Sequence, residues 1–327
     1  VGSEMCIRDR PIYGIFGASP AMFATTLLAC DMGGYPLAMQ LAEGDVAIGN
    51  FAGLILGTMM GPTIVFTIPV ALGIIKKEDR GYLGAGVLAG LITVPIGCIV
   101  GGLMMNTLAP EYHLNFITII QNLIPVIIIA ALIVLGLWFA PGPMINGFNK
   151  FGTGVTIVIT ALTAIAVFEQ ITGIMFPVFH IMVETPADGS RGLDSGLLTC
   201  GQIAIVLIGA FPMVEWITRT FGGALSKLGG ALGMNDKGSA GLVATLANNI
   251  AMFNIMGEMN PKGKLLNVAF AVSAAFVFGD HLGFAAGNDA QMIFPMIAGK
   301  LVAGVTALIV ANLLAPKLLS KIQTISK

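Results

Sequence analysis

Long apolar stretches separated by short polar links run through most of the chain. Because the hydrocarbon core of a bilayer is about 30 Å thick, a helix needs roughly 20 apolar residues to cross it. Seven stretches meet this requirement: 46–75, 82–108, 116–140, 154–182, 194–218, 265–286 and 293–315. The pattern therefore predicts an all-α polytopic membrane protein with about seven full transmembrane helices.

Two further apolar stretches are interrupted within their length. Asp31-Met-Gly-Gly divides 14–42, and Asn248-Asn249 divides 238–259. Each stretch could cross the membrane or fold back as a re-entrant hairpin. Lys and Arg concentrate in cytoplasmic links; a hairpin at 238–259 places nearly all of them on one side, whereas a full span divides them almost evenly. We therefore predict two re-entrant or broken hairpins and a cytoplasmic C-terminus.

Each predicted hairpin is followed by a span that is itself interrupted. The interruptions are Met-Met-Gly-Pro-Thr at 59–63 and Gly-Asp-His-Leu-Gly at 279–283. A hairpin followed by a broken span, once from each side of the membrane, is the organisation of inverted-repeat transporters, which bind their substrate near the midplane of the bilayer. The sequence thus indicates an inverted repeat.

The composition excludes several classes of protein. Hydrophobic residues make up 56% of the chain and charged residues only 10%, against roughly 25% charged in soluble domains, and the mean hydropathy is +0.91. A soluble globular protein is therefore excluded, and a formal net charge of −1 gives no basic face for nucleic acid. The four cysteines are far apart and form no CxxC pair, so we expect no disulfide framework, metal site or cofactor.

The first ten residues, VGSEMCIRDR, differ abruptly from the apolar chain that begins at Pro11. They resemble a translation of sequencing-adapter DNA, and such segments are excluded from fold reasoning. We expect residues 1–10 to be non-native and residues 11–327 to form one transmembrane transporter domain, with N-terminal helices missing.

Ionisable residues inside the predicted spans are the first candidates for function, because each costs at least about 2.5–3.5 kcal/mol on insertion scales. Asp31 lies beside two glycines at a predicted helix break, and Asp280 and His281 lie together at another. An Asp–His pair suits proton relay or cation binding, since His titrates near physiological pH. The alternative is a hydrogen bond that only fixes the break.

Three other polar residues lie in apolar surroundings, and each has more than one possible role. Asn248 and Asn249 offer amide groups to a hydroxyl or an amine, or polar contacts between helices. Lys300 lies inside a predicted span, where it could extend toward the interface or pair with a carboxylate.

Several long strings of the sequence together resemble one family. These are LLACDMGGYPLA (27–38), GLILGTMMGPTIVFTIPVALGII (53–75), GVLAGLITVPIGCIVGGL (86–103), GLVATLANNIAMF (241–253) and NVAFAVSAAFVFGDHLGFAA (267–286). They resemble EutH, the membrane protein of ethanolamine utilisation, in order over nearly all of residues 11–327. The resemblance implies a permease of the bacterial inner membrane that brings ethanolamine to a cytoplasmic degradative pathway, with further N-terminal helices.

The residues singled out above suit such a substrate, which is a protonated amine with a hydroxyl two carbons away. Asp31 or Asp280 would bind the ammonium, Asn248 and Asn249 the hydroxyl, and Tyr35 would offer an aromatic face for a cation–π contact. The candidate substrate-binding residues are Asp31, Tyr35, Asn248, Asn249, Asp280 and His281. We expect alternating access, with energy coupling left open; the Asp280–His281 pair permits coupling to protons.

Two alternatives belong to other classes of function. A passive channel or facilitator for a small amine or neutral solute would give non-saturating flux. An intramembrane enzyme would need the carboxyls of Asp31 and Asp280 within hydrogen-bond or one-water reach. We predict a transporter in the lipid bilayer and not an enzyme, and note that the many glycines would permit a homo-oligomer through close helix contacts.

Overall fold

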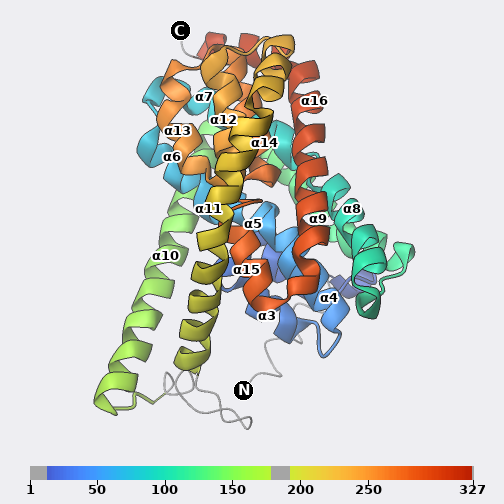
Figure 1. Ribbon diagram of the computed structural model, residues 1–327, viewed down its shortest axis with the longest axis vertical. Helices are drawn as coiled ribbons and strands as arrows, with labels where there is room; N and C mark the ends of the chain where they lie inside the picture. Colours follow the sequence, from blue (N-terminus) through green and yellow to red (C-terminus); the bar gives the residue numbers. More distant parts are fainter. Residues whose placement is uncertain (1–12, 178–191, 326–327) are drawn as a thin grey trace.

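The computed structural model describes residues 13–177 and 192–325, and the regular structure within them is entirely helical (Figure 1). The non-native interpretation of residues 1–10 lies outside the described residues. The α-helices are α2 (Ala21–Leu27), α3 (Tyr35–Leu41), α4 (Val46–Asn50), α5 (Met60–Pro62), α6 (Ile68–Ile74), α7 (Arg80–Leu91), α8 (Val94–Leu108), α9 (Phe116–Phe139), α10 (Pro141–Thr172), α11 (Gly192–Ala231), α12 (Asp236–Ala247), α13 (Asn249–Ile255), α14 (Pro261–Ala274), α15 (Asp280–Asn288) and α16 (Ile293–Ile325).

Short π-helical and 3-10 segments connect several of these helices. They are η1 (Cys30–Gly34), η2 (Phe51–Ile55), η3 (Leu56–Thr58), η4 (Thr63–Thr67), η5 (Lys77–Asp79), η6 (Pro110–Tyr112), η8 (Met256–Glu258) and η9 (Ala290–Met292). Because such segments change the hydrogen-bond register, they concentrate where helices bend.

Within the described residues, four helical segments are long and apolar enough to cross a membrane. They are Val46–Ile74, Phe116–Phe139, Pro141–Thr172 and Ala290–Gln323, and a fifth is added if Lys77–Leu91 and Val94–Leu108, bent by 42°, form one span. The prediction of an all-α membrane protein is confirmed, whereas the predicted number of about seven spans is not established by these helices.

The stretch 265–286 is not one continuous helix. α14 ends at Ala274 and α15 begins at Asp280, and the backbone N–H groups of Phe276 and Phe278 donate to the carbonyls of Thr245 (3.2 Å) and Leu246 (2.9 Å). The chain leaves the helix here because carbonyls of another segment accept these hydrogen bonds, which the membrane interior requires to be satisfied within the protein. The sequence predicted an interruption of this span at 279–283, and the structure places the break just before it, between Ala274 and Asp280.

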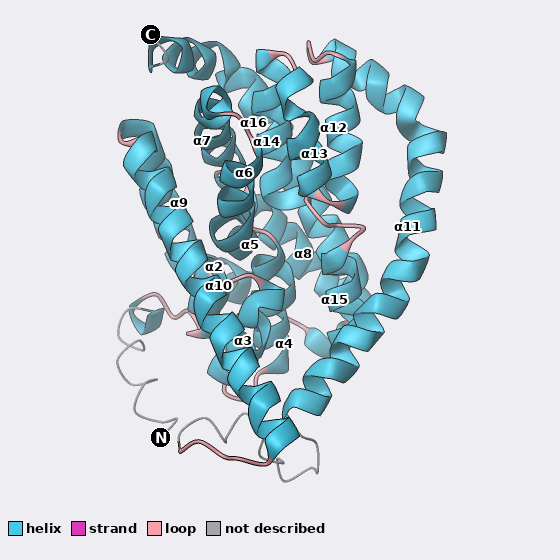
Figure 2. Cartoon of the chain, turned by 90° about the vertical axis from the view of Figure 1, so that its left-hand side faces the viewer, coloured by secondary structure: helices cyan, strands magenta, loops and turns pink. Residues whose placement is uncertain are grey.

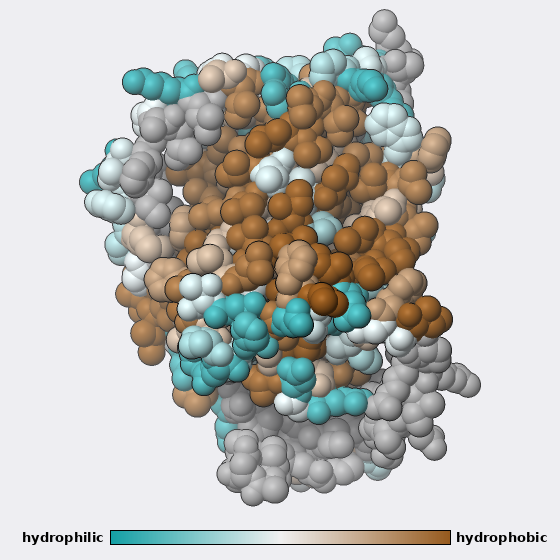
Figure 3. Space-filling view, turned by 90° about the vertical axis from the view of Figure 1, so that its right-hand side faces the viewer, coloured by the Kyte–Doolittle hydropathy of each residue, from teal (hydrophilic) through white to brown (hydrophobic). Residues whose placement is uncertain are grey.

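The outer surface carries the apolar side chains expected of a lipid-facing protein. Figure 3 shows a broad hydrophobic surface between polar groups near the upper edge and others in the lower half of that face. Exposed Leu132, Ile171 and Leu313 belong to α9, α10 and α16, three of the segments long enough to cross the membrane. Large contiguous apolar surfaces mark contact with lipid or protein, so these helices present their apolar faces outward.

Two helix pairs lie in different halves of the molecule. In the first pair α3 lies in the lower half, with α2 above it near mid-height (Figure 2), and the second pair, α12 and α13, lies in the upper half; the two helices of each pair pack on each other. The first pair breaks at Leu28–Ala29 and the second at Asn248. Helices α10 and α11 run along one side and diverge from their lower ends (Figure 2).

Each helix pair approaches a glycine of an interrupted segment very closely. We name residues 46–74 the first broken segment and residues 261–288 (α14 and α15) the second. A Cβ at Gly61 would overlap the carbonyl oxygen of Leu28, and one at Gly279 would overlap that of Ala247. Only glycine allows backbone to approach backbone this closely, so the two glycines let the breaks of the pairs meet the breaks of the segments.

A buried ion pair joins the start of α7 to the start of α14. Lys264 Nζ lies 2.5 Å from Asp79 Oδ1, and the two side chains are 12% and 2% exposed. Removing one partner of a buried pair leaves the other charge uncompensated, which typically costs 3–5 kcal/mol. We therefore expect Asp79→Asn to lower the free energy of unfolding by roughly that amount, measured as thermal unfolding in detergent.

The neighbouring carboxylate of Glu78 provides the matched control. Glu78 lies 4.0 Å from Lys76, with both side chains about 70% exposed, and exposed pairs of this kind contribute about 0–1 kcal/mol. Glu78→Gln should therefore leave the melting temperature nearly unchanged. Equal melting temperatures for the two variants would show that burial of the Asp79–Lys264 pair has no special energetic importance.

Candidate functional site

A small cavity lies where the first helix pair meets both broken segments. The space available to the centres of water-sized molecules is about 30 Å³. The lining residues are Ala29, Asp31, Pro62, Phe66, Phe276, Asp280 and His281. All seven lie at or beside interruptions of helices, so three segments distant in sequence contribute to one site.

The backbone at these interruptions explains why polar side chains reach the cavity. Met32 and Gly33 have non-helical dihedral angles, with φ of +87° at Gly33, so the chain turns directly after Asp31. On the other side Phe276 has φ of +63°, which is costly for a residue with a Cβ and persists only where the surroundings enforce it. The sequence Asp-Met-Gly-Gly thus forms the turn that follows Asp31, at the edge of the cavity.

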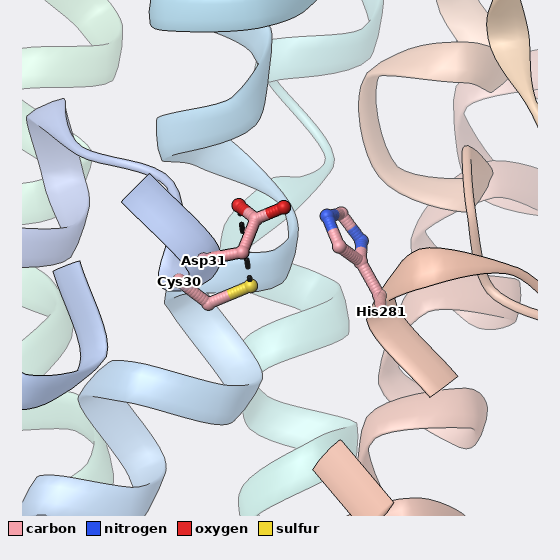
Figure 4. A group of neighbouring side chains, drawn as sticks. All are labelled: Cys30, Asp31 and His281. Carbon is pink, nitrogen blue, oxygen red and sulfur yellow. Dashed lines mark hydrogen bonds between the residues drawn. The ribbon is translucent and has the colours of Figure 1, made fainter. Parts of the chain in front are cut away.

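Cys30, Asp31 and His281 form a compact cluster. One potential ligand atom from each lies within 4.8 Å of the others, and the Cys30 thiol donates to Asp31 Oδ1 at 4.0 Å. Figure 4 shows the Asp31 carboxylate directed toward the imidazole of His281, which comes from α15. Cys30 and His281 are buried, whereas Asp31 and Asp280 remain accessible.

A buried lysine contacts this imidazole. Lys300 of α16 is 1% exposed; its Nζ donates to the carbonyl of Thr58 at 2.5 Å and lies 3.0 Å from His281 Nδ1. No carboxylate of the described residues lies within 4.0 Å of this amine. An ammonium beside the imidazole would repel a metal cation, so the cluster is better described as an amine in contact with an imidazole, with a carboxylate nearby, than as a metal site.

Two phenylalanines supply the aromatic surface of the cavity. The rings of Phe66 and Phe276 meet edge to face with their centroids 5.7 Å apart, and the Phe276 ring lies 5.2 Å from that of His281. The faces of such rings attract cations. The cavity therefore combines two carboxylates with aromatic faces.

Tyr35, the aromatic candidate from the sequence, does not line this cavity. Its hydroxyl donates to Asn50 Oδ1 at 3.2 Å, and the Asn50 amide donates to Asp289 Oδ2 at 2.7 Å. Asp289 also accepts a hydrogen bond from Tyr112, and this bond raises the pKa of Tyr112 to about 12. Tyr35 thus belongs to a separate polar network that ties α3 to α4 and to the chain just before α16.

The two asparagines of the second helix pair lie at its break. Asn248 Oδ1 accepts from the backbone N–H of Ile250 at 2.8 Å and so caps α13. Asn249 is buried and donates to Thr67 Oγ1 at 2.9 Å, while its own Oδ1 has no hydrogen-bond partner among the described residues. Neither asparagine lines the cavity, although Thr67 directly follows the lining residue Phe66.

Of the six candidate residues, the structure brings three to one cavity: Asp31, Asp280 and His281. The sequence reasoning did not select Phe66, Phe276 and Cys30, because aromatic and cysteine residues are common in any apolar span. Lys300 carried a usable signal, a charge inside a span, and the structure pairs it with an imidazole rather than with a carboxylate.

Comparisons with known proteins agree on one family. The family described as ethanolamine utilisation protein, EutH, matches residues 5–314. A protein of Listeria monocytogenes named probable ethanolamine permease EutH is 55% identical over 311 residues, which cover 95% of this chain and 79% of that protein. A protein of the same name from Escherichia coli is 52% identical over 318 residues, covering 94% and 77%.

A third relative has no assigned activity in its name. The uncharacterized protein YxeR of Bacillus subtilis is 46% identical over 307 residues, which cover 94% of this chain and 78% of that protein. No solved structure matches the chain.

Proposed function

The chain belongs to the EutH family of ethanolamine utilisation proteins, and from this premise we propose that it carries ethanolamine across the bacterial inner membrane by alternating access. The family resemblance of the sequence strings is confirmed, and the relatives whose names give an activity are permeases rather than enzymes. A cytoplasmic pathway that degrades ethanolamine and a cytoplasmic C-terminus are parts of the same proposal.

The observation that carries the proposal is the chemistry of the cavity. Ethanolamine is a small primary ammonium at neutral pH, and hydrogen bonds from an ammonium to a carboxylate are about twice as strong as neutral ones. Asp31 and Asp280 face the cavity together with Phe66 and Phe276, which suit the same cation through their ring faces. A cavity of this size favours a substrate of only a few heavy atoms.

The hydroxyl of the substrate has two candidate partners. The His281 imidazole lines the cavity and accepts or donates according to its tautomer. Asn249 holds a buried Oδ1 that has no partner among the described residues, and a hydroxyl donated to this oxygen would remove the cost of leaving it unsatisfied. We propose that the substrate contacts Asn248 and Asn249 as it passes through the protein while the second helix pair moves.

The architecture supports alternating access. The second helix pair lies in the upper half of the molecule and the first pair extends from mid-height downward (Figure 2), and each packs with its break on a glycine of a broken segment. We propose that the two pairs and their broken segments form an inverted repeat within a bundle of about seven spans, and that each pair opens the site to one side of the membrane.

The names of the relatives and the packing of the helix pairs disfavour the two alternatives. Asp31 and Asp280 line one cavity, which an intramembrane enzyme would also require, but the permease names of the relatives favour transport. A passive channel would need a continuous pore, whereas backbone of both helix pairs closes tightly on the broken segments.

Uptake of labelled ethanolamine into proteoliposomes tests the proposal, with protein-free liposomes as the control for leak. We expect saturable uptake, and accelerated entry of label when the vesicles are preloaded with unlabelled ethanolamine, because a carrier returns faster when loaded. Linear flux without this counterflow would establish the channel. Uptake no faster than in protein-free liposomes would refute ethanolamine transport.

A further inference from the structure

The buried Lys300 side chain carries a primary amine that contacts His281, a lining residue of the cavity that is proposed to receive a primary ammonium. We propose that Lys300 and the substrate ammonium take turns as the single cation of the site, so that the protein exchanges one protonated ethanolamine for one proton without moving net charge. This inference rests on the proposed transport of ethanolamine. It gives that transport a specific form of energy coupling.

The surroundings of Lys300 support one cation at a time. Among the described residues, the titratable group in contact with Lys300 is His281 of α15, 3.0 Å away. Cys30 and Asp31 of η1 lie beside that ring, and Asp280 of α15 lines the same cavity as His281. Two carboxylates in one small cavity disfavour being ionised together, so the site carries about one negative charge. One cation balances this charge, and a second would repel the first strongly in a medium of low dielectric constant.

The geometry also provides a path for the proton. His281 Nδ1 lies 3.0 Å from Lys300 Nζ, and the Asp31 carboxylate is directed toward the same ring (Figure 4). When the substrate ammonium binds at Asp31, the Lys300 proton passes to Nδ1, and the ring releases its other proton from Nε2 to water on the side that the site faces. Lys300 becomes a neutral amine and still donates to the carbonyl of Thr58.

The reverse occurs on the cytoplasmic side. The substrate leaves, and Lys300 takes a proton from the cytoplasm through the same imidazole. The loaded carrier and the empty carrier then have the same charge when they cross the membrane. Each cycle moves one ethanolammonium inward and one proton outward, so the membrane potential does no work on the exchange, while a more acidic interior drives uptake.

Proteoliposomes with an imposed potential test this directly. At about 100 mV, inside negative, a single transported positive charge gains about 2.3 kcal/mol, which corresponds to roughly 40-fold accumulation. We expect uptake by the wild-type protein to change less than about twofold between zero and this potential, and to rise when the interior is acidified. For Lys300→Gln we expect accumulation to respond to the potential by up to about 40-fold and to lose its response to the pH gradient.

Lys317→Gln is the matched control, because Lys317 lies on the same helix but is exposed and outside the cavity. It should behave as the wild type does. Uptake by the wild type that follows the potential would overturn the exchange, even if Lys300→Gln fails to fold. Uptake by Lys300→Gln that ignores the potential would equally overturn the role of Lys300. If either of these two results is obtained while uptake remains saturable, the exchange proposal is refuted but ethanolamine transport is still supported. Absence of saturable uptake by the wild type would refute ethanolamine transport itself.

Discussion

Asp31→Asn is expected to lower the initial rate of ethanolamine uptake by roughly 10- to 100-fold when the substrate concentration is below saturation. A hydrogen bond to a charged group contributes about 1.5–3 kcal/mol, and each 1.4 kcal/mol is about tenfold in affinity. The neutral amide keeps the shape of the side chain at the cavity wall but offers no charge to the ammonium. Initial rates over a range of concentrations would show the loss as a raised KM.

Two further variants make the Asp31 result specific. Asp236→Asn changes an exposed aspartate in the first turn of α12, away from the cavity, and should transport as the wild type does. Asp280→Asn changes the other carboxylate of the cavity. If Asp280→Asn lost uptake and Asp31→Asn did not, the ammonium would be assigned to Asp280. Wild-type kinetics in both variants would move the substrate out of this cavity.

Gly61→Ala is expected to abolish most of the transport activity. A Cβ at this position would overlap the Leu28 carbonyl oxygen and come within 2.8 Å of the Ala29 N. These are backbone atoms that cannot turn aside as a side chain does, so the first helix pair must shift away from the first broken segment. Overpacking of this kind costs about 1–3 kcal/mol and at times more, and the shift would displace the neighbouring Asp31.

Gly73→Ala separates this effect from a general effect of alanine in the same segment. Gly73 lies in α6, and no atom within 4 Å would meet a Cβ there, so uptake should be unchanged and the melting temperature equal or slightly higher, because alanine favours helix by up to about 1 kcal/mol. Uptake by Gly61→Ala equal to that of Gly73→Ala would show that the close contact between the first pair and the first broken segment is unnecessary for transport.

The membrane location and the three ionisable residues of the cavity could be predicted from the sequence, since each followed from a local energetic cost. Apolar length separates a span from a soluble helix wherever it occurs, and a charge inside a span is expensive whatever its partners are. These two costs were enough to select Asp31, Asp280 and His281, which the structure places around one cavity. The long shared strings added the family, which the comparisons confirm.

The remaining features depend on contacts between segments far apart in the chain. The break after Ala274 exists because carbonyls of Thr245 and Leu246 accept the freed hydrogen bonds, and no local pattern in 265–286 encodes that partner. The sequence offered Tyr35 as an aromatic face for a cation–π contact, but Tyr35 does not line the cavity, and its hydroxyl donates to Asn50 Oδ1 instead.

The sequence by itself determined that this chain is an all-α membrane protein of the EutH family with costly polar groups at its helix breaks. Only the tertiary structure decided that Phe66 and Phe276 supply the aromatic faces and that the Lys300 amine lies against His281. The physical reason is that the cost of burying a charge belongs to the residue itself, whereas the partner that compensates the charge is chosen by packing between helices.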